Sequence, residues 1–115
     1  MEIQVSDRKL RKTLEDEKEC KRHFGAEMAK KIQIRMGALL AAESLADFWP
    51  PYSGPERTHE LKGDLTGTFS VDLKQPYRLL FGPTDPANNS ATKDDKERWR
   101  AIQAITILRI EDTHG

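Results

Sequence analysis

Apolar and polar residues alternate with two different periods along the chain, which divides it into a helical half and a strand-rich half. The opening run EIQV alternates strictly, so it predicts a short first strand. Ser6 suits an N-cap, and residues 7–21 follow a helical pattern with a thin apolar stripe at Leu10 and Leu14. After a Phe-Gly break, a second helix is expected over 26–43. Its apolar residues recur at spacings of three and four, as in a core-facing helix: Met28, Ile32, Met36, Leu39 and Leu40.

The second half has the period of a sheet. Three hairpin-linked strands are predicted by short apolar runs separated by turn residues: 57–61, 68–73 and 77–81. The run 102–110 is apolar on both faces, which predicts a central strand covered on each side. Before it, residues 82–100 are expected as a long loop or insertion. Within that stretch, Lys93–Arg100 is expected either as a short polar helix or as the extension of a strand.

The predicted order of elements is β-α-α-β-β-β-β. Short consecutive strands favour hairpin-linked neighbours. The expected fold is therefore α+β, with two N-terminal helices packed on a mainly antiparallel twisted sheet. A length of 115 residues is typical of one domain, here residues 1–115.

Charge changes this picture little. Lys and Arg number 19, Asp and Glu also number 19, and charged residues make up 33% of the chain. Residues 1–36 hold ten Lys or Arg against seven Asp or Glu, an excess of three positive charges, and residues 37–115 hold nine against twelve. Such an asymmetry is weak evidence for a polyanionic partner.

Several kinds of chemistry are disfavoured. A lone cysteine, Cys20, allows neither a disulfide framework nor a thiolate metal cluster. Its cationic neighbours favour a lowered thiol pKa, and a surface cysteine without a role is expected. No apolar run is long enough for a membrane span, and no signal peptide opens the chain, so the cytoplasm is the expected location. Phosphate-loop, nucleophile-elbow and zinc spacings are absent, and neither metal nor cofactor is expected.

Groups that could carry chemistry gather in the sheet half: His59, Lys62, Asp64, Arg78, Arg109, Asp112 and His114. They converge if the last strand is central. A base, an acid and fixed cations suit RNA cleavage in which the 2′-hydroxyl attacks the adjacent phosphate, and imidazole carries protons near neutral pH. Alternatives stay open: ordinary surface histidines, Arg78 paired across the sheet with Asp72 or Glu60, and a frayed tail.

The sheet half also contains three motifs in order: Leu61-Lys62-Gly63-Asp64, Tyr77-Arg78-Leu79-Leu80-Phe81 and Glu111-Asp112-Thr113-His114. Together with the element order, they resemble the HigB branch of the RelE/ParE toxin superfamily over nearly the whole chain. The resemblance implies a type II toxin that cleaves messenger RNA in the ribosomal A site. It implies as partners the ribosome, messenger RNA and a helix-turn-helix antitoxin of the HigA kind, with no small-molecule cofactor and no membrane.

Residue roles follow from the same resemblance. His59 and His114 would transfer protons, Lys62 and Arg78 would hold the phosphate, and Asp112 would orient His114 or position the substrate. The basic first helix would face ribosomal RNA through phosphate contacts. The predicted RNA-binding residues come from this helix and from the segment around Trp99. They are Lys9, Arg11, Lys12, Lys18, Arg22, Arg98 and Trp99.

Thr113 stands where the family has an aromatic residue that could stack on a base. Trp99, between Arg98 and Arg100, offers another stacking surface, and a packed tryptophan is an equal alternative. The second functional hypothesis is a RelE-fold binding protein without nuclease activity, which engages an antitoxin or a non-RNA target such as gyrase.

Overall fold

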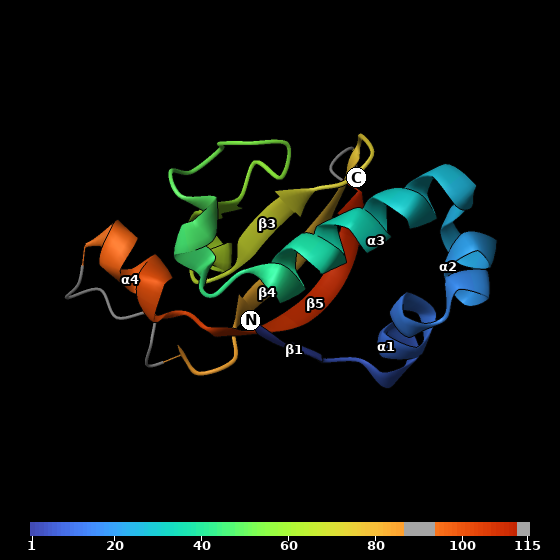
Figure 1. Ribbon diagram of the computed structural model, residues 1–115, viewed down its shortest axis with the longest axis horizontal. Coiled ribbons are helices and arrows are strands. Elements are labelled where there is room, and N and C mark those ends of the chain that lie inside the picture. Colours follow the sequence, from blue (N-terminus) through green and yellow to red (C-terminus); the bar gives the residue numbers. More distant parts are fainter. Residues whose placement is uncertain (87–93, 113–115) are drawn as a thin grey trace.

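One five-stranded sheet organises the molecule, as a computed structural model shows (Figure 1). The structure describes residues 1–86 and 94–112. The strands are β1 (Glu2–Val5), β2 (His59–Glu60), β3 (Phe69–Asp72), β4 (Tyr77–Pro83) and β5 (Ala104–Asp112). Their order in the sheet is β1-β5-β4-β3-β2, with β1 parallel to β5 and the other pairs antiparallel. The predicted α+β class and the mainly antiparallel sheet are confirmed.

Helices flank this sheet. They are α1 (Arg8–Glu15), α2 (Glu17–Phe24), α3 (Ala26–Ala41) and α4 (Asp95–Ala101), with 3-10 turns η1 (Leu45–Phe48) and η2 (Gly63–Leu65). In Figure 1, α3 lies along the sheet, α1 and α2 lie at one end of the molecule, and α4 with η1 lies at the other. No helix of the described residues is long and apolar enough to cross a membrane.

The prediction of a single helix over residues 7–21 is wrong. This segment forms two helices, α1 and α2, which are joined at Asp16, whose backbone is extended (φ −106°, ψ 112°). The Asp16 carboxylate accepts hydrogen bonds from the backbone N–H groups of Lys18 (2.9 Å) and Glu19 (3.2 Å), so it caps α2. The predicted cap at Ser6 is also wrong, because Asp7 caps α1.

Replacing Asp16 by alanine is expected to lower the free energy of unfolding by about 1 kcal/mol, since two N–H groups at the start of α2 lose their acceptor. Urea unfolding followed by circular dichroism measures the change. Glu15→Ala, an exposed neighbour that caps nothing, is the matched control. Equal stability of the two variants would contradict the capping role.

The stretch 82–100 was expected as a long loop, and much of it is regular. β4 continues through Pro83, and Asp94 caps α4 by accepting a hydrogen bond from the Glu97 N–H at 2.8 Å. The short-helix alternative for Lys93–Arg100 is therefore confirmed over the helical residues. Residues 87–93 lie outside the described part of the chain.

The core lies between α3 and one face of the sheet. Met28, Ile32 and Leu39 are buried on α3, as predicted, whereas Leu40 is 59% exposed and does not join them. The strands supply the opposite wall: Phe69, Val71, Leu79, Phe81, Ile105 and Ile107. The predicted central position of the last strand is confirmed, because β5 lies between β1 and β4.

The other face of the sheet, here called the second face, holds the alternate residues of each strand. Two rows are in register across it: His59, Ser70, Leu80 and Arg109, then Asp72, Arg78 and Glu111. Ser70 and Leu80 are fully buried, but Arg109 is exposed. The prediction that β5 is covered on both sides is thus wrong for its C-terminal part. That part opens to solvent on the second face.

Candidate functional site

Arg78 lies on the second face, where β4 positions it opposite Glu111 of β5. Its Nε and Nη2 atoms both donate to Glu111 Oε2, at 3.0 and 2.6 Å. Arg109 Nη2 lies 3.7 Å from the other oxygen of the same carboxylate. The alternative partners considered for Arg78 are wrong, because Asp72 pairs with Arg57 and Glu60 pairs with Arg98. Glu111 therefore holds a two-arginine cluster that the sequence did not reveal.

His59 lies on the same face, on the edge strand β2. Strand spacings put its Cα roughly 12 Å from that of Arg78, because the two residues are two strands and two positions apart. Its Nδ1 lies 2.8 Å from the carbonyl oxygen of Arg57. A carbonyl only accepts, so Nδ1 carries the proton, and Nε2 of the neutral ring keeps its lone pair. That is the tautomer that a general base acting through Nε2 requires.

Tyr52 fixes the plane of the His59 ring. The two rings are stacked with centroids 4.1 Å apart and an interplanar angle of 16°. The Arg57 guanidinium lies 5.2 Å from the centroid of the Tyr52 ring. Sequence reasoning missed Tyr52, since its only signal was an aromatic residue after a proline pair.

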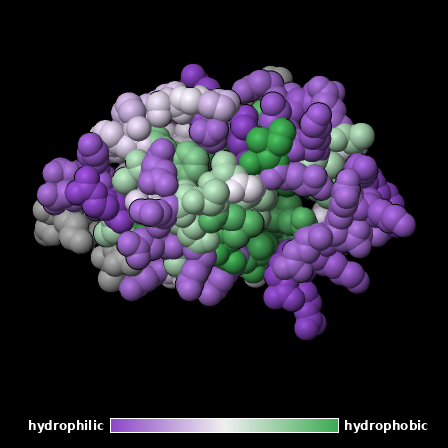
Figure 2. All heavy atoms as spheres, viewed as in Figure 1, coloured by the Kyte–Doolittle hydropathy of each residue, from purple (hydrophilic) through white to green (hydrophobic). Residues whose placement is uncertain are grey.

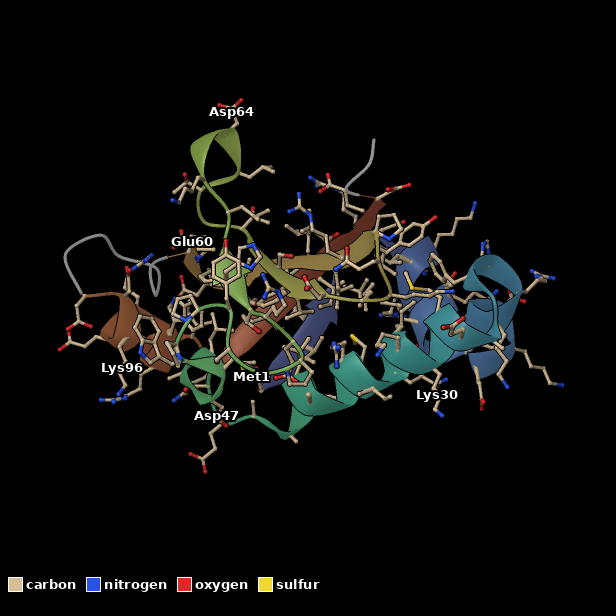
Figure 3. All side chains as sticks on the ribbon, turned by 90° about the horizontal axis from the view of Figure 1, so that it is seen from above. Met1, Lys30, Asp47, Glu60, Asp64 and Lys96 are labelled. Carbon is tan, nitrogen blue, oxygen red and sulfur yellow. The ribbon has the colours of Figure 1, made fainter. Side chains whose placement is uncertain are left out.

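Lys62 and Asp64 belong to the turn after β2. Lys62 is exposed and precedes η2, where Gly63 adopts a left-handed backbone (φ 68°). Figure 3 shows Asp64 at the outer tip of η2, pointing away from the sheet. The motif therefore brings Lys62 near His59, since both line one pocket, and leaves Asp64 outside the site.

Asp112 ends β5 and is exposed, opposite Tyr77. Strand alternation gives it the face opposite to that of Arg78 and Glu111. Asp112 is therefore not the carboxylate that Arg78 contacts, which is Glu111. His114 and Thr113 lie outside the described residues, so the predicted pairing of His114 with His59 stays a prediction.

The five predicted RNA-binding residues of the first helical region are exposed: Lys9, Arg11, Lys12, Lys18 and Arg22. They lie on α1 and α2, at one end of the molecule, where the visible surface is mostly hydrophilic (Figures 1 and 2). Two of them also face acidic neighbours, since Arg11 lies 3.8 Å from Glu15 and Arg22 lies 2.7 Å from Glu19. These exposed pairs contribute little to stability, and contact of the five cations with RNA stays a prediction.

The stacking role predicted for Trp99 is corrected. Its side chain is 1% exposed and packs edge-on against Trp49 and Phe69, with centroids 5.1 and 5.6 Å away. The packed-tryptophan alternative is the right one. Arg98, the other predicted contact of this segment, donates to Glu60 at 2.8 Å and to Asp95 at 2.6 Å. Burial would lower the pKa of Arg98, but the two carboxylates outweigh it and raise that pKa.

Cys20 is also corrected, from a surface residue to a core residue that is 1% exposed. Burial raises the pKa of its thiol, whereas the cationic neighbours in sequence had favoured a lowered one. The described residues hold no group of three or more His, Cys, Asp or Glu side chains suited to a metal ion.

Iodoacetamide is expected to alkylate Cys20 in the folded protein at least about tenfold more slowly than in the urea-unfolded chain at pH 8. Burial excludes the reagent, and a raised pKa leaves less thiolate. Mass spectrometry of timed samples measures both rates on the one cysteine of the chain. Similar rates would contradict the buried position.

Comparison with known proteins gives the class of fold at this point. The search against family models found no match, and neither did the search of curated proteins. The fold is similar to that of a toxin of known structure. A solved YoeB/ParE toxin from Agrobacterium tumefaciens superposes with a TM-score of 0.57 over 97% of this chain and 98% of that chain, at 15% sequence identity.

Proposed function

We propose that this protein is the toxin of a type II toxin–antitoxin pair and that it cleaves messenger RNA on the ribosome, without a metal ion. The observation that supports the proposal best is that His59 and Arg78 share one face of a sheet whose fold matches a YoeB/ParE toxin over nearly its full length. The cytoplasm would be its place of action, and a helix-turn-helix antitoxin of the HigA kind would neutralise it.

The proposed reaction needs one base, one acid and a cation. His59 Nε2 takes the proton from the 2′-hydroxyl, and O2′ attacks the adjacent phosphorus. Arg78 stabilises the charge that develops on the phosphoryl oxygens, with Lys62 as a second cation. The P–O5′ bond breaks, and an acid protonates O5′, which leaves a 2′,3′-cyclic phosphate and a 5′-hydroxyl. His114 is the predicted acid, and Asp112 is predicted to orient it.

Mapping of 5′-hydroxyl ends on messenger RNA tests this function. The protein is expressed with and without an inhibitor that empties ribosomes of messenger RNA. We expect new ends within translated regions that disappear with the inhibitor. If folded protein accumulates and no translation-linked ends appear, the proposed activity is wrong.

A non-catalytic binding protein of the same fold is the second candidate, and one contact favours it. Arg78 already makes two hydrogen bonds to Glu111, so its guanidinium is matched by a carboxylate of the protein itself. Such a protein would engage an antitoxin or a target such as gyrase. If alanine at both His59 and His114 left growth inhibition intact, this candidate would replace the nuclease.

Replacing Glu111 by glutamine is expected to raise the cleavage rate at low substrate by about twofold to fivefold. Glu111 competes with the phosphate for Arg78, and a half-exposed ion pair is worth up to about 1 kcal/mol. Single-turnover cleavage on ribosomes measures the change, with Glu43→Gln as the control for an equal loss of charge elsewhere. A large loss of activity in Glu111→Gln would instead make Glu111 a positioning residue for Arg78.

A further inference from the structure

A pocket of 560 Å³ opens beside His59, between the loop that follows η1, strand β2, turn η2 and helix α4. Side chains of quite different chemistry surround it: Tyr52, His59, Glu60, Lys62, Arg98 and Trp99. Figure 3 shows Glu60 on the side of the sheet that borders α4 and η2. Among the predicted site residues, His59 and Lys62 both contribute to this pocket.

One wall is aromatic and held in place. Tyr52 is 52% exposed, yet it stacks on His59 at a centroid distance of 4.1 Å. Its backbone is left-handed (φ 66°), a conformation that costs energy for a bulky residue. The Tyr52 N–H donates to the Thr58 carbonyl at 3.0 Å, and the Ser53 hydroxyl donates to the Phe48 carbonyl at 3.1 Å. The Arg57 guanidinium also lies 5.2 Å from the centroid of this ring, so a flat ligand that stacks on Tyr52 takes the place of that cation. Because the ring is already fixed, such stacking has a low entropic cost.

Of the remaining walls, one is apolar and the others carry charged side chains. The nearly buried indole of Trp99 lies at one side. Glu60 and Arg98 form a half-buried ion pair at 2.8 Å, with side chains 19% and 12% exposed. Lys62 is exposed at the rim and provides a positive charge. A flat aromatic wall, an apolar side and a cation at the rim together match a nucleobase that carries a phosphate.

We propose that this pocket binds one nucleobase of single-stranded RNA, stacked against the Tyr52–His59 ring pair, with Lys62 near the adjoining phosphate. The inference rests on the proposed function in so far as the nucleotide belongs to the RNA substrate. Tyr52 then supplies the aromatic surface that Thr113 lacks. Because the pocket shares His59 with the candidate site, a base held there fixes which phosphate of the RNA lies nearest to the imidazole.

The test uses the full chain and nuclear magnetic resonance titration with the four ribonucleoside 5′-monophosphates and with ribose 5-phosphate. At least one nucleotide is expected to shift the resonances of Tyr52, His59 and the Trp99 indole, and to bind at least about tenfold more tightly than ribose 5-phosphate. Binding that is equal with and without the base would reduce the site to a phosphate contact and overturn the proposal. Absence of binding up to millimolar concentration would overturn it as well.

Three variants separate stacking from folding. Tyr52→Phe keeps the ring and should bind within about twofold of the parent, whereas Tyr52→Asn removes the ring and should bind roughly tenfold more weakly. Asparagine tolerates the left-handed backbone, so this variant should stay folded. Tyr77→Asn removes another exposed tyrosine, which lies outside the pocket, and should bind like the parent. Unchanged binding in folded Tyr52→Asn would contradict the stacking wall.

These titrations measure no cleavage, so they fail independently of the proposed function. A protein that cleaves messenger RNA and binds no nucleotide here would retain the proposed function and lose the pocket assignment. A protein that binds nucleotides in the pocket and cleaves nothing would do the opposite.

Discussion

Replacing Arg78 by alanine is expected to slow RNA cleavage by roughly 10²–10³-fold, the loss typical of removing one group that stabilises charge in a transition state. The guanidinium already adopts a geometry suited to an oxyanion, because two of its nitrogens donate to a single oxygen of Glu111. A phosphoryl oxygen that displaces this carboxylate would find both donors in position. Single-turnover cleavage of messenger RNA bound to ribosomes measures the rate.

Two further variants serve as comparisons for the cleavage rate of Arg78→Ala. Arg78→Lys keeps the charge and loses the fork of donors, so an intermediate rate is expected. Arg100→Ala removes an exposed arginine of α4 and should cleave like the parent. Cleavage at the parental rate by folded Arg78→Ala would contradict the role of Arg78 and favour the non-catalytic binding protein.

Replacing Trp99 by alanine is expected to lower the free energy of unfolding by about 3–5 kcal/mol. Trp99 is among the largest fully buried side chains, and its edge-on contacts with Trp49 and Phe69 join α4 to the residue that follows η1 and to the sheet. Urea unfolding followed by circular dichroism measures the change. Trp99→Phe keeps an aromatic ring and should lose less. A loss below about 1 kcal/mol would contradict the packed position and would return Trp99 to the predicted RNA contacts.

Much of the sheet could be predicted because strands leave a simple pattern. The last strand is rich in apolar residues, and its central position follows from that composition. The break at Asp16 could not be predicted in this way. An aspartate has nearly the same helical pattern whether it continues a helix or caps the next one, and the thin apolar stripe of this region gave no packing signal.

The face taken by each residue at the end of β5 escaped prediction for a different reason. Ile107 lies opposite Phe81 and Arg109 lies opposite Leu80, so Leu108 is an extra residue in a bulge. Unbroken alternation from Ile107 would give Asp112 the face of Arg78. The bulge reverses this and gives that face to Glu111. A sequence shows which residues follow a strand, but a bulge depends on the partner strand.

The motifs in the sequence predicted candidate residues of the site, but they did not predict which side chains those residues contact. Arg78 and His59 share a face, and Lys62 joins His59 at the pocket. Glu111 and Tyr52 were not foreseen, because their importance comes from contacts across the sheet and from a loop conformation. Neither leaves a spacing that marks it in the sequence.

The place of β5 between β1 and β4 also sets the order in which the molecule can be completed during synthesis. Both neighbours of β5 precede it in the chain, so the middle of the sheet is the last part to be made. While β5 is still inside the ribosome, β1 has no partner and Glu111 cannot meet Arg78. A nascent chain is therefore expected to lack the Arg78–Glu111 pair until β5 has left the ribosome and paired with β4.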